Sequence, residues 1–127
     1  MQKLNIYQSL WGMEIRSPHR PERSKEETFA MIRAAGFHGA CTDPGVEDLA
    51  KYRKFAHLFE LNGLGCMVNA FPSTPDEMAP ILDFAVEMKA CMVNVISGVM
   101  PIKPEDAVDD VRRWIGEAAN RDMPLLF

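Results

Sequence analysis

Short apolar stretches alternate with longer stretches in which apolar residues recur every three or four positions. The short stretches hold β-forming residues between turn residues, which predicts strands, and the periodic stretches predict amphipathic helices. The predicted strands are 4–11, 37–42, 64–71, 91–96 and 123–127. The predicted helices are 25–35, a stretch through 49–59 that ends at 62–63, a stretch through 81–88, and a stretch that opens at 104 and continues through 118.

The helix starts carry their own signals. Residues 24–27 form a capping box, and 74–77 repeat the same chemistry before the third helix. Asp43 is expected to cap the second helix, because Pro44 after it already has a helical φ. Pro80 lies inside the third helical pattern and is expected to kink it.

Strands that alternate with helices across short turns predict parallel pairing and an α/β fold. The tetrapeptide Cys-Met-Val-Asn occurs at 66–69 and again, 25 residues later, at 91–94. Cys41 precedes Cys66 by the same distance. An equal pitch over three units suits the constant geometry of a barrel better than an irregular sheet.

Several short motifs resemble the xylose isomerase-like TIM barrel family, which includes sugar phosphate isomerases and epimerases and endonuclease IV-type enzymes. They are Ala-Gly-Phe-His-Gly-Ala at 35–40, Gly-Leu at 63–64, Phe-Pro at 71–72 and Ile-Leu-Asp-Phe-Ala at 81–85. His38 departs from the pattern, since many relatives have an acidic residue there. That turn lies at the entrance of a strand, so no catalytic role depends on it.

The resemblance implies a parallel (β/α) barrel with a divalent metal (Mn, Mg or Zn) at its carboxyl-end mouth, held by acidic residues and a histidine. The first metal ligand of the family is usually a glutamate at the end of strand five, and here 124–127 end the sequence. A complete barrel needs about 250 residues. Residues 1–127 are therefore expected to form the N-terminal part, truncated after about five strands and four helices, without metal ligands or a bound cofactor.

Barrel active sites lie at the carboxyl ends of the strands. The candidates there are Trp11, Asp43, Asn69, Phe71, Asn94 and Ser97. We predict that Trp11, Asn69, Phe71 and Asn94 bind substrate, while the catalytic residues stay unknown. Structural alternatives remain for four of the candidates: Asn69 and Asn94 as hydrogen-bonding groups inside the barrel, Trp11 as a core residue, and Asp43 as a helix cap. Glu14 is expected to be a solvated loop carboxylate.

Side-chain alternation along strands sorts the other residues near these candidates. If the two asparagines face the barrel interior, one set shares their side and the other faces the helices. The first set is Met67, Phe71, Met92 and Ile96, and the second is Cys66, Val68, Cys91 and Val93. The cysteines are then expected to be packing residues rather than reactive thiols.

The composition argues against several classes of protein and of functional site. The chain is 47% hydrophobic and 25% charged, as in globular domains, and its net charge of −4 comes without a basic cluster interleaved with aromatics, which argues against nucleic acid. No signal peptide or membrane-spanning stretch is visible, so a cytoplasmic location is expected. The three cysteines form no CxxC pair, and the three histidines lack metal-ligand spacing.

Three functions remain open. The first is a fragment, inactive alone, of a metal-dependent sugar or sugar phosphate isomerase or epimerase, which moves a proton or hydride next to the carbonyl of a small sugar or polyol. The second is a hydrolase, lyase or endonuclease IV-like enzyme on the same barrel. The third is a non-catalytic half-barrel that associates with itself or another chain through its open sheet edges.

Overall fold

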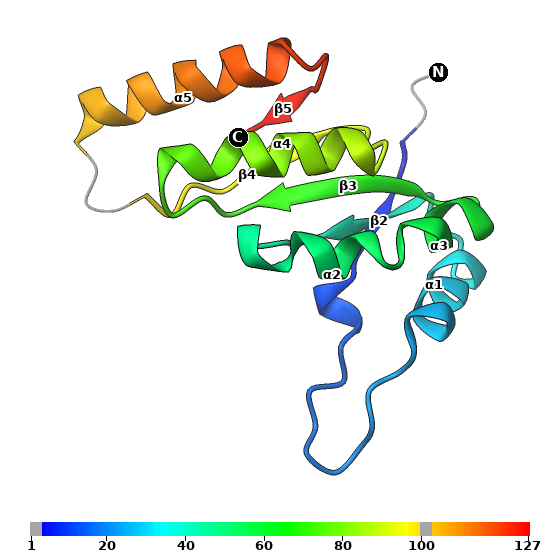
Figure 1. The fold of residues 1–127 in the computed structure, drawn as a ribbon. Coiled ribbons are helices and arrows are strands. Elements are labelled where there is room, and N and C mark those ends of the chain that lie inside the picture. The colour runs from blue at the N-terminus through cyan, green and yellow to red at the C-terminus, as the bar shows by residue number, and fades with distance from the viewer. Residues whose placement is uncertain (1–3, 100–102) are drawn as a thin grey trace.

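The computed structural model describes residues 4–99 and 103–127. They form an α/β fold around one five-stranded, all-parallel sheet in the order β1-β2-β3-β4-β5 (Figure 1). The strands are β1 (Tyr7–Ser9), β2 (Gly39–Thr42), β3 (Gly65–Ala70), β4 (Val93–Val95) and β5 (Leu125–Leu126). Every strand therefore pairs with the strand that follows it in the sequence, and all five predicted strands are present in shortened form.

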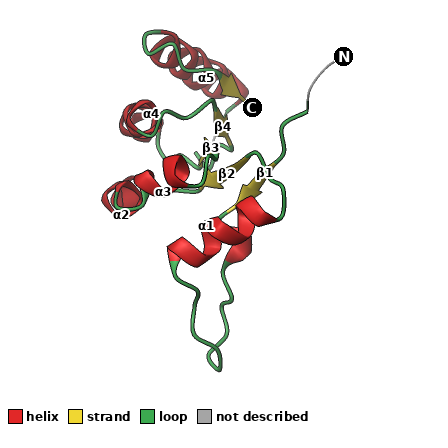
Figure 2. Cartoon of the chain, turned by 90° about the vertical axis from the view of Figure 1, so that its right-hand side faces the viewer, coloured by secondary structure: helices red, strands yellow, loops and turns green. Residues whose placement is uncertain are grey.

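The helices are also close to those predicted, with one interruption. They are α1 (Lys25–Ala34), α2 (Leu49–Arg53), α3 (Ala56–Leu61), α4 (Met78–Glu87) and α5 (Pro104–Ala119). Short 3₁₀ turns at Trp11–Met13, Val46–Asp48 and Pro75–Glu77 precede some of them. The second predicted helix is divided at Lys54 and Phe55 into α2 and α3. The helices gather along one side of the sheet (Figure 2).

The register of the sheet explains the repeated tetrapeptide. Val68 pairs with Val93 and Asn69 with Asn94, so the two copies lie side by side. The same 25-residue spacing does not make Cys41 and Cys66 partners, because Cys41 pairs with Met67 and Ala40 pairs with Cys66. Cys41 consequently points to the opposite face of the sheet from Cys66.

The predicted helix caps are only partly confirmed. Ser24 Oγ accepts a hydrogen bond from the Glu27 amide at 3.0 Å, as the capping box requires. Thr74 makes no such bond, although Glu77 Oε2 accepts from the amide of Ser73 at 2.8 Å.

Two expectations for the helix starts are not met. Asp43 does not cap a helix, since the 3₁₀ turn begins after Gly45 and the carboxylate has other partners. Pro80 is the third residue of α4, where the missing amide costs no helical hydrogen bond, so no kink is required.

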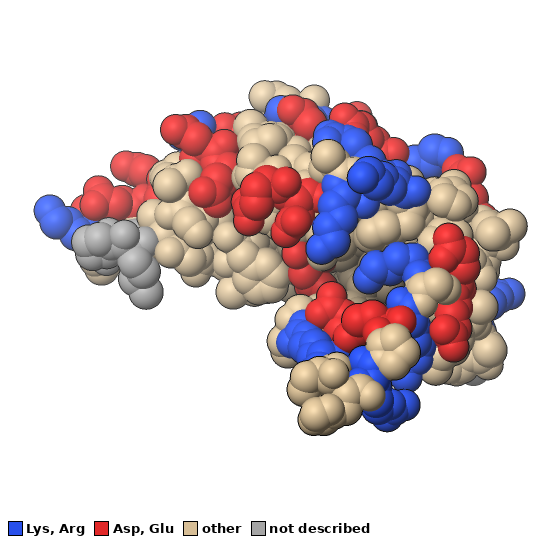
Figure 3. Space-filling model, turned by 60° about the horizontal axis from the view of Figure 1, so that its bottom comes forward, with Lys and Arg blue, Asp and Glu red and all other residues tan. Residues whose placement is uncertain are grey.

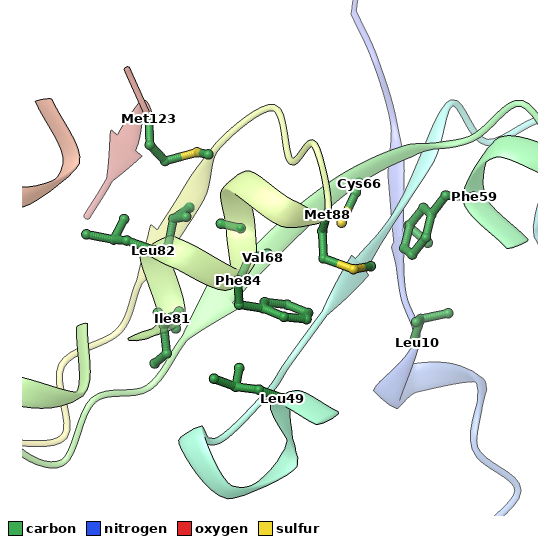
Figure 4. Packing of buried hydrophobic residues seen from close by; sticks show 14 of the residues in the cluster. Leu10, Leu49, Phe59, Cys66, Val68, Ile81, Leu82, Phe84, Met88 and Met123 are labelled. Atoms are coloured by element: carbon green, nitrogen blue, oxygen red, sulfur yellow. The ribbon is translucent and has the colours of Figure 1, made fainter. Parts of the chain in front are cut away.

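The hydrophobic core lies between the helices and one face of the sheet. Val68 of β3 is fully buried there, and Figure 4 shows Ile81, Leu82 and Phe84 of α4 packed near it. The indole of Trp114 fixes α5, because it is 1% exposed and its Nε1 donates to the Pro75 carbonyl at 3.0 Å. The predicted burial of Cys66, Val68 and Val93 on the helix side is confirmed.

Within residues 4–99 and 103–127 no helix covers the other face of the sheet, which we call the open face. Its residues include Tyr7, Ser9, Cys41, Met67, Asn69 and Asn94. The predicted packing of Cys91 against the helices is wrong: the residue is exposed, and its Sγ donates to the Tyr7 hydroxyl on the open face at 3.5 Å. The physical reason is that β4 begins only at Val93, so strand alternation does not govern Cys91.

The outer surface mixes charges of both signs. On the face shown in Figure 3, acidic and basic side chains lie next to one another. Ion pairs of 2.6 to 2.9 Å join helices or neighbouring turns, as between Arg121 and Asp83 or Arg113 and Glu117. No helix within 4–99 or 103–127 is both long enough and apolar enough to cross a bilayer.

Candidate functional site

Four polar side chains form a continuous hydrogen-bonded chain across the open face. Ser9 Oγ donates to Asp43 Oδ2 at 3.3 Å, and Asn69 Nδ2 donates to Asp43 Oδ1 at 2.7 Å. Asn94 Nδ2 donates to Asn69 Oδ1 at 3.1 Å. Four consecutive βα units therefore contribute one residue each to a single polar array, which we call the polar row.

The parallel register brings these residues together. Ser9 ends β1 and pairs with Cys41. Asp43 lies two residues after Cys41, directly after the end of β2. Asn69 and Asn94 are paired neighbours on β3 and β4. All four consequently lie at or near the carboxyl ends of their strands, the edge at which parallel α/β sheets bind ligands.

An aromatic pocket adjoins the polar row. It has a volume of about 440 Å³ and is lined by Ser9, Trp11, Asp43 and Phe71. Trp11 is 61% exposed and Phe71 49%, so the alternative that Trp11 is a core residue is wrong. Volumes of this size hold small organic ligands, and exposed aromatic faces beside hydrogen-bonding groups suit amphipathic ones.

Burial and neighbouring carboxylates both affect the tyrosine that contacts Asp43. Tyr52 donates its hydroxyl to the Asp43 carbonyl at 3.3 Å. Its pKa is raised, first by burial and then by the carboxylates of Asp43, Asp48 and Glu14. Deprotonated tyrosine is thus disfavoured beside the pocket, and the hydroxyl remains a donor at neutral pH.

Thiol chemistry is not supported for the two buried cysteines. Burial is the main cause that raises the pKa of Cys41 to about 11 and that of Cys66 to about 12. Both therefore stay protonated at neutral pH, as packing residues do. The hydrogen-bonded contact with Cys91, followed by burial, raises the pKa of Tyr7 to about 12.

The structure brings together most of the residues singled out from the sequence. Asn69 and Asn94 lie in the polar row, and Trp11 and Phe71 line the pocket. Ser97 lies outside, where its Oγ accepts from the Val99 amide at 3.3 Å.

Ser9 was missed by the sequence reasoning. Its signal was available, because it is the last polar residue of the predicted first strand and precedes Trp11 by two positions in the sequence. Glu14, expected to be a solvated loop carboxylate, is exposed and forms an ion pair with Arg16 at 2.8 Å.

Replacing Asn69 with aspartate tests the polar row. The new carboxylate of Asn69→Asp would face Asp43 at the position of a 2.7 Å hydrogen bond, and adjacent carboxylates cannot both ionise freely. We expect the free energy of unfolding at neutral pH to fall by about 2 kcal/mol. One folded-state pKa of the pair is raised above its unfolded value, so the loss should shrink as the pH falls through that raised pKa.

Urea titrations at several pH values measure this effect. Asn5→Asp, which adds the same charge at an exposed residue, is the matched control and should change stability little. Equal stability losses in both variants at every pH would contradict the hydrogen-bonded row.

The site does not fit a metal ion by itself. Asp43 is the one carboxylate in the polar row, and both its oxygens already accept hydrogen bonds. Among residues 4–99 and 103–127, no group of three His, Cys, Asp or Glu side chains is placed to hold a metal.

In comparisons with known proteins, no family model and no curated protein matches the chain.

Proposed function

We propose that the chain is the N-terminal part of a (β/α)₈ barrel whose parent protein is a sugar or sugar phosphate isomerase or epimerase. The sheet order supports this, because five parallel strands follow one another without reversal and the helices lie on one side (Figure 2). A doubly wound sheet would reverse its order and place helices on both faces. A barrel extends this arc by adding strands next to β5.

The polar row beside the aromatic pocket is the observation that carries the proposed substrate class. Sugars and polyols present hydroxyl groups along one edge and C–H groups on their ring faces. Hydroxyls match the amides of Asn69 and Asn94, and C–H faces match Trp11 and Phe71. Asn94 Oδ1 accepts no hydrogen bond from the residues that the structure describes, so it can accept one from a ligand hydroxyl.

Charge favours an unphosphorylated ligand portion at this subsite. The polar row contains the carboxylate of Asp43 and no cation. The nearby guanidinium of Arg16 is already paired with Glu14. A phosphate group of a sugar phosphate would therefore be bound elsewhere in the parent protein.

The family resemblance also implies a divalent metal that polarises the sugar carbonyl, but the residues of this site do not fit one. We therefore propose no metal-bound step for this chain. Its own residues bind and orient the ligand: Asn69 and Asn94 through hydrogen bonds, and Trp11 and Phe71 by excluding water from one side.

The test is a ligand titration of the ¹⁵N-labelled chain followed by NMR. D-Xylose, D-fructose and D-glucitol should shift the side-chain amide signals of Asn69 and Asn94 and the indole signal of Trp11. Asn94→Ala should weaken binding about tenfold, because one hydrogen-bonding amide is lost. Asn120→Ala, at the exposed end of α5, should bind as the unchanged chain does.

Turnover provides the second measurement. With Mn²⁺ or Mg²⁺ the 127-residue chain is expected not to isomerise D-xylose or D-fructose, since it supplies no metal site in its described part. Absence of any sugar-induced shift would contradict the proposed ligand class. Rapid isomerisation by this chain alone would contradict the proposal that it is only the N-terminal part of a barrel and lacks the catalytic residues.

A second candidate, association with another chain, is favoured by the sheet edges. Ile6 before β1 is 51% exposed, and Leu126 and Phe127 at β5 are 54% and 56% exposed. Uncovered edge strands with apolar side chains tend to pair with further strands. Light scattering distinguishes a stable monomer from such an assembly.

A further inference from the structure

The exposed indole of Trp11 is covered on one side by an arginine. The guanidinium carbon of Arg16 lies 3.9 Å from the centre of the ring, within the range of a cation–π contact. Arg16 Nη2 also approaches the Trp11 carbonyl at 3.4 Å. Arg16 is not one of the residues that line the aromatic pocket, whereas Trp11 is.

Two glutamates hold Arg16 in place. Glu14 Oε2 accepts a hydrogen bond from Arg16 Nε at 2.9 Å, and the same oxygen lies 2.8 Å from Arg16 Nη2 in an ion pair. Glu22 accepts from the backbone amides of Ile15, at 2.9 Å, and Arg16, at 2.6 Å. These hydrogen bonds from backbone amides lower the pKa of Glu22, so its carboxylate is ionised at neutral pH.

The backbone of Arg16 is itself unusual. Its φ of 50° lies in the left-handed region, which residues with a Cβ rarely adopt without local support. The Glu22 bonds supply that support from across the loop between β1 and α1. Loop geometry, side-chain pairing and ring contact thus all place one guanidinium on one indole.

We propose that Arg16 is a positioning residue for ligand binding: held by Glu14 and Glu22, it fixes the Trp11 indole so that the free side of the ring forms a wall of the pocket. This inference rests on the proposed function. A 61% exposed side chain would otherwise sample several rotamers, and ordering it on binding would weaken affinity. With Arg16 in place, the Trp11 side chain is already ordered before the ligand binds.

The indole resonances of the ¹⁵N-labelled chain provide a direct test. The chain has two tryptophans, and the buried Trp114 serves as an internal reference for a rigid ring. In Arg16→Ala the heteronuclear NOE of the Trp11 indole should fall while that of Trp114 stays unchanged, and affinity for D-glucitol should drop about tenfold. Arg16→Lys keeps the charge but not the planar stack, so it should recover part of both losses.

Arg20→Ala is the matched control, since it removes an arginine from the same loop whose side chain makes no ion pair within residues 4–99 and 103–127. It should leave the Trp11 signal and the affinity unchanged. A rigid Trp11 in Arg16→Ala, or a mobile one that binds D-glucitol normally, would overturn the positioning role. If the unaltered chain binds no polyol, the proposed function fails. Loss of indole order in Arg16→Ala would still show that Arg16 fixes the Trp11 ring.

Discussion

Replacing Gly39 with alanine is expected to lower the free energy of unfolding by about 3 kcal/mol. A Cβ at this position would overlap both the ring of Tyr7 and the backbone carbonyl oxygen of Gly65. The ring can turn away, but a carbonyl that belongs to the β2–β3 pairing cannot move without disturbing the sheet. Chemical denaturation monitored by circular dichroism measures the change.

A matched glycine should respond in the opposite direction. Gly116 lies on the exposed side of α5, and a Cβ there would meet nothing within 4 Å. Gly116→Ala should therefore stabilise the chain by up to about 1 kcal/mol through helix propensity. Shortening the Tyr7 side chain should not rescue Gly39→Ala, because the carbonyl overlap remains. Equal stability of Gly39→Ala and the unaltered chain would show that β2 and β3 do not approach as closely as described.

Replacing Trp114 with alanine is expected to lower the free energy of unfolding by about 4 kcal/mol. The side chain is 1% exposed and joins α5 to the 3₁₀ turn that precedes α4, so its removal leaves a large cavity and an unpaired Pro75 carbonyl. Thermal and urea unfolding measure this loss.

Trp114→Phe separates the contribution of packing from that of the hydrogen bond to the Pro75 carbonyl. It keeps most of the apolar surface but loses the Nε1 donor, so a loss of about 1–2 kcal/mol is expected. Ile115→Ala changes the adjacent, 50% exposed residue of the same helix and should have a smaller effect than Trp114→Ala. Similar losses at 114 and 115 would contradict the docking of α5 through one face.

The sequence predicted the parallel α/β arrangement well because its signals are local. Alternating strand and helix patterns set the element order, and the repeated tetrapeptide marked two units of equal length, whose asparagines the structure pairs. The interruption between α2 and α3 was not predicted, since it depends on tertiary packing: Phe55, at the break, is buried and contacts the ring of Phe29 at a centroid distance of 6.1 Å.

The candidate site was predicted in its residues more than in its contacts. Asn69, Asn94, Trp11 and Phe71 were identified from their places at strand ends, which strand periodicity reveals. The role of Asp43 was misjudged, because Asp before Pro is a strong local cap signal and its real partners lie 26 and 34 residues away in the sequence. Such partners depend on the register between strands, which a local pattern does not encode.

The direction of the hydrogen bonds in the polar row has an electrical consequence. Asn94 donates to Asn69, and Asn69 donates to Asp43, so both amides are aligned toward the same carboxylate. Successive amides in such a line polarise one another. The negative charge of Asp43, which follows β2, thereby polarises the amide of Asn94 on β4. The Oδ1 of Asn94 is consequently a stronger hydrogen-bond acceptor for an incoming hydroxyl than the oxygen of an isolated amide.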